Sequence, residues 1–241
     1  MKIDQILSKT DHRPWPLPLG IWRFFQEWND VLFLHWKVDL ELLQTYLPKD
    51  LEIDTFEGSA FVSLVAFTME NVRPRNLPAF GPISDFHEIN IRTYVKYKGR
   101  SGVYFLSIEG GKRLSCVIAR SISGLPYVFS KMDRSGTKYS SFDPKLGNSF
   151  RTNYKVGSDI QEKTAQDEWL TERYALFQDV NDKLVSFDIH HLEWPIQNVE
   201  VNDLEFQYPD FQRLLVGEPQ IAHYSHGVRV LAWSKVYLEG R

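Results

Sequence analysis

The sequence predicts an α+β fold that is mainly antiparallel β-sheet, and three observations support this prediction. Three pairs of strand-like runs are each joined by a short turn rich in glycine, asparagine, aspartate or lysine. The helical patterns between these pairs are few and short. The chain lacks the regular alternation of strands and helices that indicates a doubly wound sheet. We therefore expect a strand-rich sheet or barrel with a few inserted helices.

In the first half of the chain the predicted elements are a helix at 2–9, a strand at 31–38, a helix at 39–47, a hairpin of 51–56 with 59–69, and a hairpin of 86–97 with 103–108. Asp39 can cap the second helix. Glu57 and Gly58 form the turn of the first hairpin. Because residues 61–67 are almost continuously apolar, we expect both faces of that strand to be buried.

In the second half the predicted elements are a helix around 114–121, strands at 126–133, 137–142 and 148–156, a helix at 164–173, a hairpin of 174–180 with 183–191, and a strand within 220–238. The pair Thr164 and Asp167 fits a capping box that begins the helix. Asn181 and Asp182 form the hairpin turn. Residues 195–215 give no clear pattern.

Length and composition restrict the class of protein. The 241 residues, of which 43% are hydrophobic, could form one large domain or two small ones, and the resemblance described below implies one domain over 1–241. The net charge of −3 gives no reason to expect a nucleic-acid partner. No stretch reaches the ~18 apolar residues of a membrane span, and the first residues lack a signal peptide pattern. We therefore expect a cytoplasmic protein without nucleic-acid or membrane partners.

The strand at 86–97 carries the first candidate site. Strict alternation puts Glu88, Asn90, Arg92 and Tyr94 on one face. A face exposed to solvent is the ordinary explanation for such a pattern. Two features favour a pocket instead: asparagine is disfavoured inside strands, and the neighbouring run 103–108 is apolar on both faces, so this hairpin is not expected at an edge. Both explanations remain open from the residues alone.

The second candidate site follows the helical run around 114–121. Gly124 is expected to close this helix, and Pro126 to stop it before a new strand. Arg120, near the helix end, either neutralises the C-terminal carbonyls or captures a carboxylate. Tyr127 is either a core residue or a pocket hydroxyl. With the strand face, these residues predict a pocket for a small anionic molecule.

A packed ion network of Glu88, Arg92 and Arg120 would produce the same sequence pattern as a pocket. Metal and nucleophile sites find less support. The histidine pairs, 190–191 and 223 with 226, match no chelating motif, so we expect neither a metal nor a cofactor. Cys116, the single cysteine, excludes an internal disulfide, and on an apolar helical face it is expected to be a core residue.

Several segments together resemble the YqjF-like family of bacterial proteins, which has no assigned function. They are 12–16, 32–36, 86–95, 102–105, 124–127, 171–174 and 191–195. The middle third, from the strand of Glu88 through the turn at Pro126, is similar in turn to acetoacetate decarboxylase. This resemblance implies a single domain on a large curved antiparallel β-barrel with an internal pocket.

The decarboxylase pattern has an arginine followed by Gly-x-Pro-Lys-Lys, in which the first lysine forms a Schiff base with a keto acid and the second lowers its pKa. Arg120, Gly124 and Pro126 match this pattern. The two lysine positions hold Tyr127 and Val128. Schiff-base chemistry is therefore not expected to carry over.

The resemblance and the residues together predict an internal pocket for a small carboxylate- or carbonyl-bearing metabolite. Glu88, which occupies a place similar to the acidic pocket residue of the decarboxylase, would be a general acid/base if chemistry occurs. Arg92 and Arg120 would hold the anion. Asn90, Tyr94 and Tyr127 would complete the substrate contacts. Lys131 could replace the missing lysine only if it pointed into the pocket and were desolvated.

Two other functions fit the same sequence. One is a non-catalytic ligand-binding or sensory module on the same pocket, which differs from the enzyme only in the role of Glu88. The other is a protein-interaction domain, for which removal of Arg92 or Arg120 would change little beyond stability. A homo-oligomer is compatible with each of these functions, and nothing in the sequence fixes its size.

Overall fold

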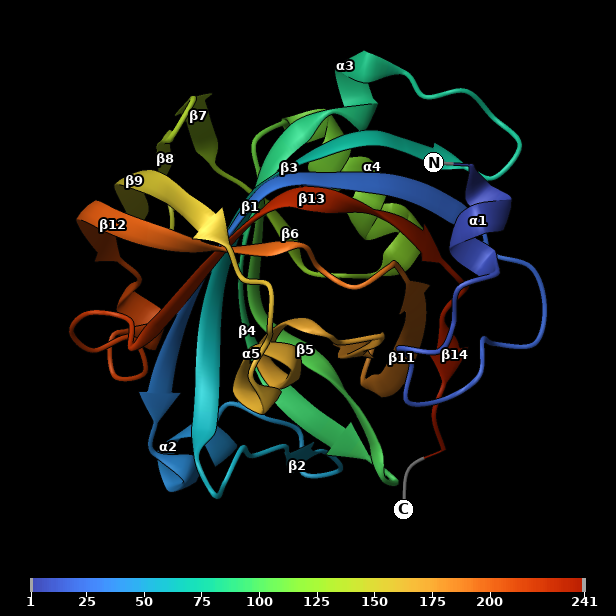
Figure 1. The fold of residues 1–241 in the computed structure, drawn as a ribbon, viewed down its shortest axis with the longest axis horizontal. Coiled ribbons are helices and arrows are strands. Elements are labelled where there is room, and N and C mark those ends of the chain that lie inside the picture. Colours follow the sequence, from blue (N-terminus) through green and yellow to red (C-terminus); the bar gives the residue numbers. More distant parts are fainter. Residues whose placement is uncertain (1, 240–241) are drawn as a thin grey trace.

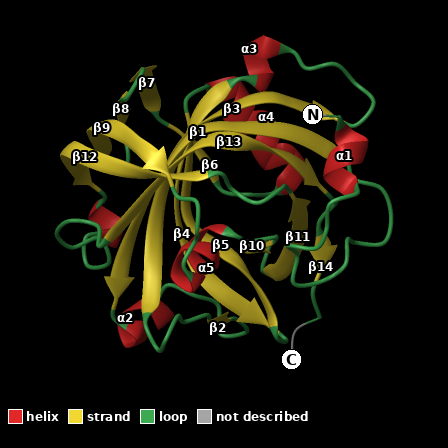
Figure 2. Ribbon diagram, viewed as in Figure 1, coloured by secondary structure: helices red, strands yellow, loops and turns green. Residues whose placement is uncertain are grey.

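The computed structural model describes residues 2–239, which form mostly strands with a few short helices (Figure 2). The helices are α1 (Ile3–Leu7), α2 (Leu40–Gln44), α3 (Gly81–Ser84), α4 (Arg113–Ser123) and α5 (Ala165–Thr171), with a 3₁₀ turn at Pro209–Phe211. The strands are β1 (Phe24–Val38), β2 (Glu52–Ile53), β3 (Ala60–Pro74), β4 (Phe86–Tyr97), β5 (Arg100–Gly110), β6 (Tyr127–Phe129), β7 (Lys131–Ser135), β8 (Lys138–Asp143), β9 (Asn148–Asp159), β10 (Ala175–Val180), β11 (Lys183–His190), β12 (Ile196–Gln207), β13 (Ile221–Ala232) and β14 (Val236–Tyr237). None of the described helices is long and apolar enough to cross a membrane.

Seven of these strands close into a ring. In the sheet order, β11, β10, β5, β4, β3, β1 and β13 are successive neighbours, and β11 pairs with β13 to complete the circuit. Most neighbours are antiparallel, but β5 lies parallel to both β10 and β6, so the sheet is mixed. Strands β12, β9, β8 and β7 continue from β13 beyond the ring and lie at the left of Figure 1.

The ring strands separate two apolar interiors. Alternate residues of β1, β3 and β4, among them Leu34, Leu64 and Ile91, pack into a core shared with β8, β9 and the segment after β12. The intervening residues, among them Phe33 and Val65, pack into a second core inside the ring. Residues 61–67 are all buried, as expected for a strand that packs on both faces. Successive side chains of β4 therefore point alternately into the core shared with β8 and β9 and into the core inside the ring.

The hairpins at 86–97 with 103–108 and at 174–180 with 183–191 are confirmed as β4–β5 and β10–β11. The predicted hairpin of 51–56 with 59–69 is wrong. The short β2 pairs with β4, and only the isolated bridge of Phe56 with Ser59 joins the two runs. The predicted strand at 126–133 divides into β6 and β7, which pair with different neighbours. A local apolar pattern does not identify the partner strand, which is chosen by tertiary packing.

Helix α4 is confirmed, and Gly124 ends it as the sequence predicts. Gly124 adopts a left-handed conformation at φ 81°, and its N–H bonds to the carbonyl of Arg120. A Cβ atom there would lie 2.5 Å from Cγ1 of Val180. The helix crosses over from β5 to the parallel β6, which puts Tyr127 beside Ile108. Because Ile108 pairs with Asn90, this crossover places Tyr127 next to the candidate face of β4.

Candidate functional site

The four candidate residues of β4 point into the ring and not toward solvent. Glu88, Asn90, Arg92 and Tyr94 have exposed fractions of 2, 3, 8 and 0%. The explanation of this face as solvated is therefore wrong. It is lined by the apolar residues that β3 places opposite in the register, such as Val65 beside Asn90 and Phe67 beside Glu88. We call these four residues and Tyr127 the interior cluster.

Glu88 is a buried carboxylate that hydrogen bonds hold in place. The hydroxyl of Tyr127 donates to Oε2 at 2.8 Å, and the amide of Asn90 donates to Oε1 at 3.1 Å. Burial raises the pKa of Glu88 to about 7, although these two bonds act against the shift. An acid with a pKa near neutrality can both accept and donate a proton at physiological pH, which is what general acid/base chemistry requires.

Arg92 is a buried cation with no carboxylate partner among the described residues. Its Nε and Nη2 atoms have no hydrogen-bond partner among the described residues, and its guanidinium lies over the Phe33 ring at 5.6 Å. Burial lowers the pKa of Arg92, while the neighbouring Tyr94 hydroxyl opposes that shift. Within residues 2–239, no ion pair joins Arg92 to Glu88 or to any other carboxylate. The structure therefore does not support a packed ion network at this position.

Arg120 lies apart from the interior cluster. Its side chain is exposed and donates to the backbone carbonyl of Tyr127, whose hydroxyl points the other way, to Glu88. Arg120 lines a surface groove of about 470 Å³ together with Arg113, Cys116, Val117, Ser121, Tyr127, Phe129 and Lys145. Tyr127 thus connects a groove rich in cations with the buried acid behind it. The role of Arg120 as an anion contact stays a prediction, now on the outer side of Tyr127.

No lysine replaces the Schiff-base residue inside the ring. Lys131 is exposed and lines the outer surface near Arg120, so it does not meet the condition of pointing inward and being desolvated. No lysine side chain belongs to the buried set of the described chain. The position that the decarboxylase pattern gives to the first lysine is taken by the Tyr127 hydroxyl, which is bonded to Glu88.

Several polar residues outside the predicted set of site residues pack beside Tyr94. The Tyr94 hydroxyl lies 2.7 Å from Oγ of Ser63, which in turn lies 2.6 Å from Nδ1 of His35. His223 is next to His35. These residues sit on separate strands, and their only sequence signal is a polar residue within an otherwise apolar run. No group of three or more metal-ligating side chains gathers anywhere in residues 2–239, and the expected absence of a metal stays a prediction.

Cys116 is expected to be unreactive in the folded protein. Its side chain is buried, and burial together with the Glu88 carboxylate raises the thiol pKa to about 11. Since the thiolate is the nucleophile, this shift lowers the reactive fraction about 100-fold from that of an ordinary thiol. We expect a disulfide reagent to modify the native protein at least about 100-fold more slowly than the urea-unfolded chain. Rapid modification of native Cys116 would contradict its assignment as a core residue.

Comparison with known proteins identifies relatives along most of the chain. The family model DUF2071, described as an uncharacterized conserved protein, matches residues 25–229. The protein YqjF of Bacillus subtilis (strain 168), itself described as uncharacterized, is 37% identical over 225 residues, which cover 90% of this chain and 93% of that protein.

Solved structures of the acetoacetate decarboxylase type share the fold at low identity. An acetoacetate decarboxylase-like enzyme from Sphingomonas wittichii RW1 matches with a TM-score of 0.64 and 18% identity, over 92% of this chain and 94% of that one. The enduracididine biosynthesis enzyme MppR, complexed with pyruvate, matches with a TM-score of 0.61 and 14% identity, over 94 and 93% of the two chains. At these identities the likeness concerns the fold alone. The predicted fold class is thereby confirmed.

Proposed function

This chain belongs to the DUF2071 family of uncharacterized conserved proteins, and from that premise we propose that it binds a small carboxylate- or carbonyl-bearing metabolite at the interior cluster. The observation that carries the proposal is the guanidinium of Arg92, which is buried and has no partner for Nε and Nη2 among the described residues. A buried cation is costly unless it is paired. A ligand carboxylate would supply both the charge and the two acceptors.

The other members of the interior cluster have distinct tasks in this proposal. Glu88 is the general acid/base, because its pKa of about 7 allows transfer in either direction. Tyr127 holds the Glu88 carboxyl and forms the wall between it and the outer groove. The cations of that groove, Arg113, Arg120 and Lys145, attract an anion toward the wall. The chemistry that fits is non-covalent proton transfer next to a carbonyl, such as enolisation, hydration or dehydration.

A thermal-shift screen tests binding. Pyruvate is one probe, since a structural neighbour binds it, and the panel adds other 2-oxo acids, 3-oxo acids, hydroxy acids and dicarboxylates. A ligand at one hundred times its Kd stabilises by about 2.7 kcal/mol, which raises Tm by about 5–11 °C in a domain of this size. Arg92→Met should abolish the shift. Arg92→Lys, which keeps the charge but loses the planar pair of donors, should reduce it.

The matched control is Arg151→Met, which removes an arginine whose side chain is 68% exposed, and it should leave the shift intact. Arg120→Met distinguishes the role of the outer groove from that of the interior cluster. If this variant raises Kd but keeps the ligand-dependent shift in Tm, Arg120 attracts the anion and does not bind it at the cluster. If no ligand of the panel shifts Tm, or if a shift survives in Arg92→Met, the proposed site is wrong.

Glu88→Gln distinguishes an enzyme from a non-catalytic ligand-binding or sensory module. Glutamine keeps the shape and an acceptor for Tyr127 but cannot exchange a proton. For an enzyme we expect ligand binding to survive and turnover to be lost. For a sensory module, wild type and variant should bind alike, with no turnover in either. Cytoplasmic location, the small-molecule partner and a homo-oligomeric state also stay predictions.

A further inference from the structure

A continuous line of hydrogen-bonded side chains passes from strand to strand on the inner face of the ring and ends at the interior cluster. We call it the polar ladder, and its members in order are Asp167, His223, His35, Ser63 and Tyr94. Asp167 lies on α5 at the surface end, where 16% of its side chain is exposed. His35, Ser63 and Tyr94 have exposed fractions of 0%. The ladder therefore leads from solvent into the fully buried interior.

Each link has hydrogen-bonding distance. Oδ1 of Asp167 lies 2.9 Å from Nε2 of His223, and Nδ1 of His223 lies 3.2 Å from Nε2 of His35. Nδ1 of His35 lies 2.6 Å from Oγ of Ser63. Oγ of Ser63 lies 2.7 Å from the Tyr94 hydroxyl. Each histidine has a hydrogen-bond partner at both ring nitrogens, so the line of hydrogen bonds continues through both rings.

The pairing order of the ring strands explains why four of these residues, although far apart in sequence, lie next to one another, and α5 contributes the fifth, Asp167. β13, β1, β3 and β4 are neighbours in that order, and each contributes one ladder residue. His35 is directly opposite Ser63, and Ser63 is directly opposite Arg92. His223 is opposite Phe33, so the ladder runs diagonally across the strands, and it reaches β4 at Tyr94, two residues from Arg92.

Counting protons shows that the ladder has two complete arrangements. The Tyr94 hydroxyl can donate to the carbonyl of Leu170, which lies 2.9 Å away. Ser63 then donates to Tyr94, Nδ1–H of His35 to Ser63, and Nδ1–H of His223 to Nε2 of His35. Nε2 of His223 faces a carboxylate, so this arrangement needs a second proton on His223. It is complete only when His223 is an imidazolium.

With one proton fewer, the three inner links reverse, while His223 keeps its Nε2–H bond to Asp167. A neutral His223 donates from Nε2 to Asp167, and Nε2–H of His35 donates to Nδ1 of His223. Ser63 then donates to Nδ1 of His35, and Tyr94 donates to Ser63. When an imidazolium at His223 passes its Nδ1 proton to His35, one proton moves along each of the three inner links and one leaves at Tyr94, with no charge left on His223, His35 or Ser63.

We propose that the polar ladder conducts protons between His223, which Asp167 holds at the surface end, and the Tyr94 hydroxyl, and that Tyr94 is thereby a second acid/base group at the Arg92 end of the site. The second clause rests on the proposed function, because it requires a ligand oxygen near Arg92 to exchange the proton with Tyr94. The conduction itself depends only on the ladder. Glu88 and Tyr94 would then serve opposite ends of the interior cluster.

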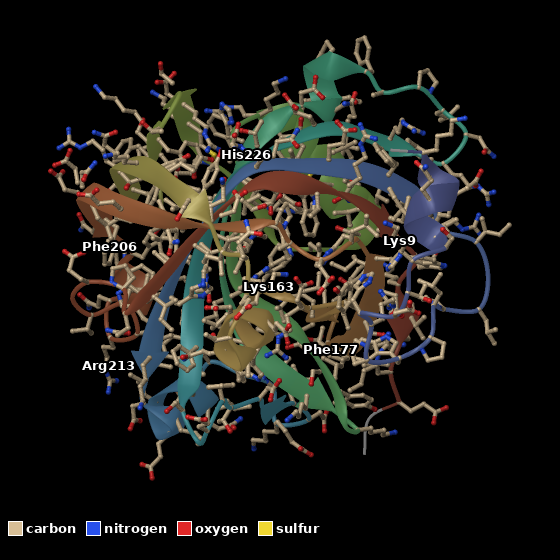
Figure 3. All side chains as sticks on the ribbon, viewed as in Figure 1. Lys9, Lys163, Phe177, Phe206, Arg213 and His226 are labelled. Carbon is tan, nitrogen blue, oxygen red and sulfur yellow. The ribbon has the colours of Figure 1, made fainter. Side chains whose placement is uncertain are left out.

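The surrounding charges favour a proton on His223 over one on His35. Burial lowers the pKa of His35 far below its ordinary value, and both His223 and Arg92 lower it further. Burial and Lys163, in the segment that leads into α5 (Figure 3), also lower the pKa of His223, but Asp167 opposes them. The exchangeable proton is therefore held next to the carboxylate that meets solvent. The two rings should respond differently to pH.

The test is a pH titration of the unliganded wild type, followed by the ring ¹⁵N signals of labelled histidines. As pH falls, His223 should become charged, at a midpoint below that of an ordinary histidine. Over the same midpoint His35 should stay neutral but change its protonated nitrogen from Nε2 to Nδ1. If His35 keeps one tautomer throughout, or becomes charged itself, the ladder is a static packing network and the proposal is overturned.

Asp167→Asn checks the coupling. Loss of the carboxylate should lower the His223 midpoint, and the tautomer change of His35 should move with it to the same lower pH. Glu168→Gln, an exposed neighbour on the same helix, is the control and should move neither. A His35 transition that stays in place while the His223 midpoint moves would refute coupling.

This experiment needs no ligand, so it is independent of the metabolite screen. A positive titration with no ligand response would refute the proposed function and leave proton conduction in place. A ligand response with a single His35 tautomer would refute the ladder alone. In a turnover assay, Ser63→Ala should lower kcat more than it changes KM, because it removes the relaying hydroxyl and leaves only the longer contact of 3.4 Å between the Tyr94 hydroxyl and Nδ1 of His35.

Discussion

Replacement of Arg92 by methionine is expected to increase the free energy of unfolding of the unliganded protein by about 1–3 kcal/mol. The guanidinium is buried, and its Nε and Nη2 have no partner in the described chain, so folding removes these two donors from water without a replacement hydrogen bond. Methionine is flexible enough to fill the space beside Phe33 and carries no charge. Urea unfolding without ligand, at constant m-value, measures the change.

Arg173→Met is the matched control. Arg173 is similarly buried, but it makes an ion pair with Asp54 at 2.6 Å. The same substitution there should destabilise by about 3–5 kcal/mol, because the carboxylate loses its buried partner. Both variants replace a buried arginine by methionine, but only Arg173 has a carboxylate partner, Asp54, among the described residues of the wild-type protein. If Arg92→Met destabilised the protein as much as Arg173→Met does, the Arg92 guanidinium would be a structural group, and its assignment as a ligand contact would fail.

Glu88→Gln is expected to be more stable than wild type at pH 8. The difference in free energy of unfolding between variant and wild type should grow by about 3 kcal/mol, in favour of the variant, from pH 4.5 to pH 8. The carboxyl is protonated in the folded state below a pKa of about 7, whereas in the unfolded chain it ionises near its ordinary 4.5. Between these values the folded state binds more protons. Wild-type stability therefore falls as pH rises through this window. Glutamine has no such penalty, and unfolding curves from pH 4.5 to 8 measure the difference.

Glu172→Gln should show the opposite sign. Burial acts against ionisation of Glu172, but His191 and Lys163 outweigh it and bring the pKa below the ordinary value. Its carboxylate accepts bonds from Lys163, Tyr174 and the backbone of Trp194. The glutamine variant should therefore lose stability at neutral pH and recover relative to wild type in acid. A Glu88→Gln variant that followed this second pattern would contradict the raised pKa and the acid/base role.

The strand of Glu88 shows what a local pattern can establish. Alternation along 86–97 was enough to group Glu88, Asn90, Arg92 and Tyr94 on one face, because successive side chains of any strand point to opposite sides. It did not decide whether that face met solvent or a core. That depends on the closure of the ring and on α4 and α5, whose residues Cys116 and Leu170 pack in the same interior core as Tyr94. The same limit explains the incorrect hairpin of 51–56, whose β2 strand pairs with β4 instead.

Arg120 and the polar ladder are features that a local sequence pattern could not predict. The sequence placed Arg120 near the end of a helix but could not tell that its side chain stays outside while the hydroxyl of Tyr127 turns inward. In the ladder, His35 is 28 residues from Ser63 and 188 from His223, and Asp167 is 56 from His223. None of these spacings forms a motif, so only the pairing order of β13, β1, β3 and β4 brings them together.

The sequence by itself determined the strand-rich class, the hairpins at β4–β5 and β10–β11, the end of α4 at Gly124 and the residues that share the polar face of β4. Each of these depends on turn chemistry or side-chain period over a few neighbouring residues. Only the tertiary structure decided that this face is buried, that Nε and Nη2 of Arg92 have no hydrogen-bond partner among the described residues, that Glu88 meets Tyr127, and that a polar ladder reaches the interior. These features depend on the closure of the ring, since the free energies of buried charges are set by what distant segments place around them.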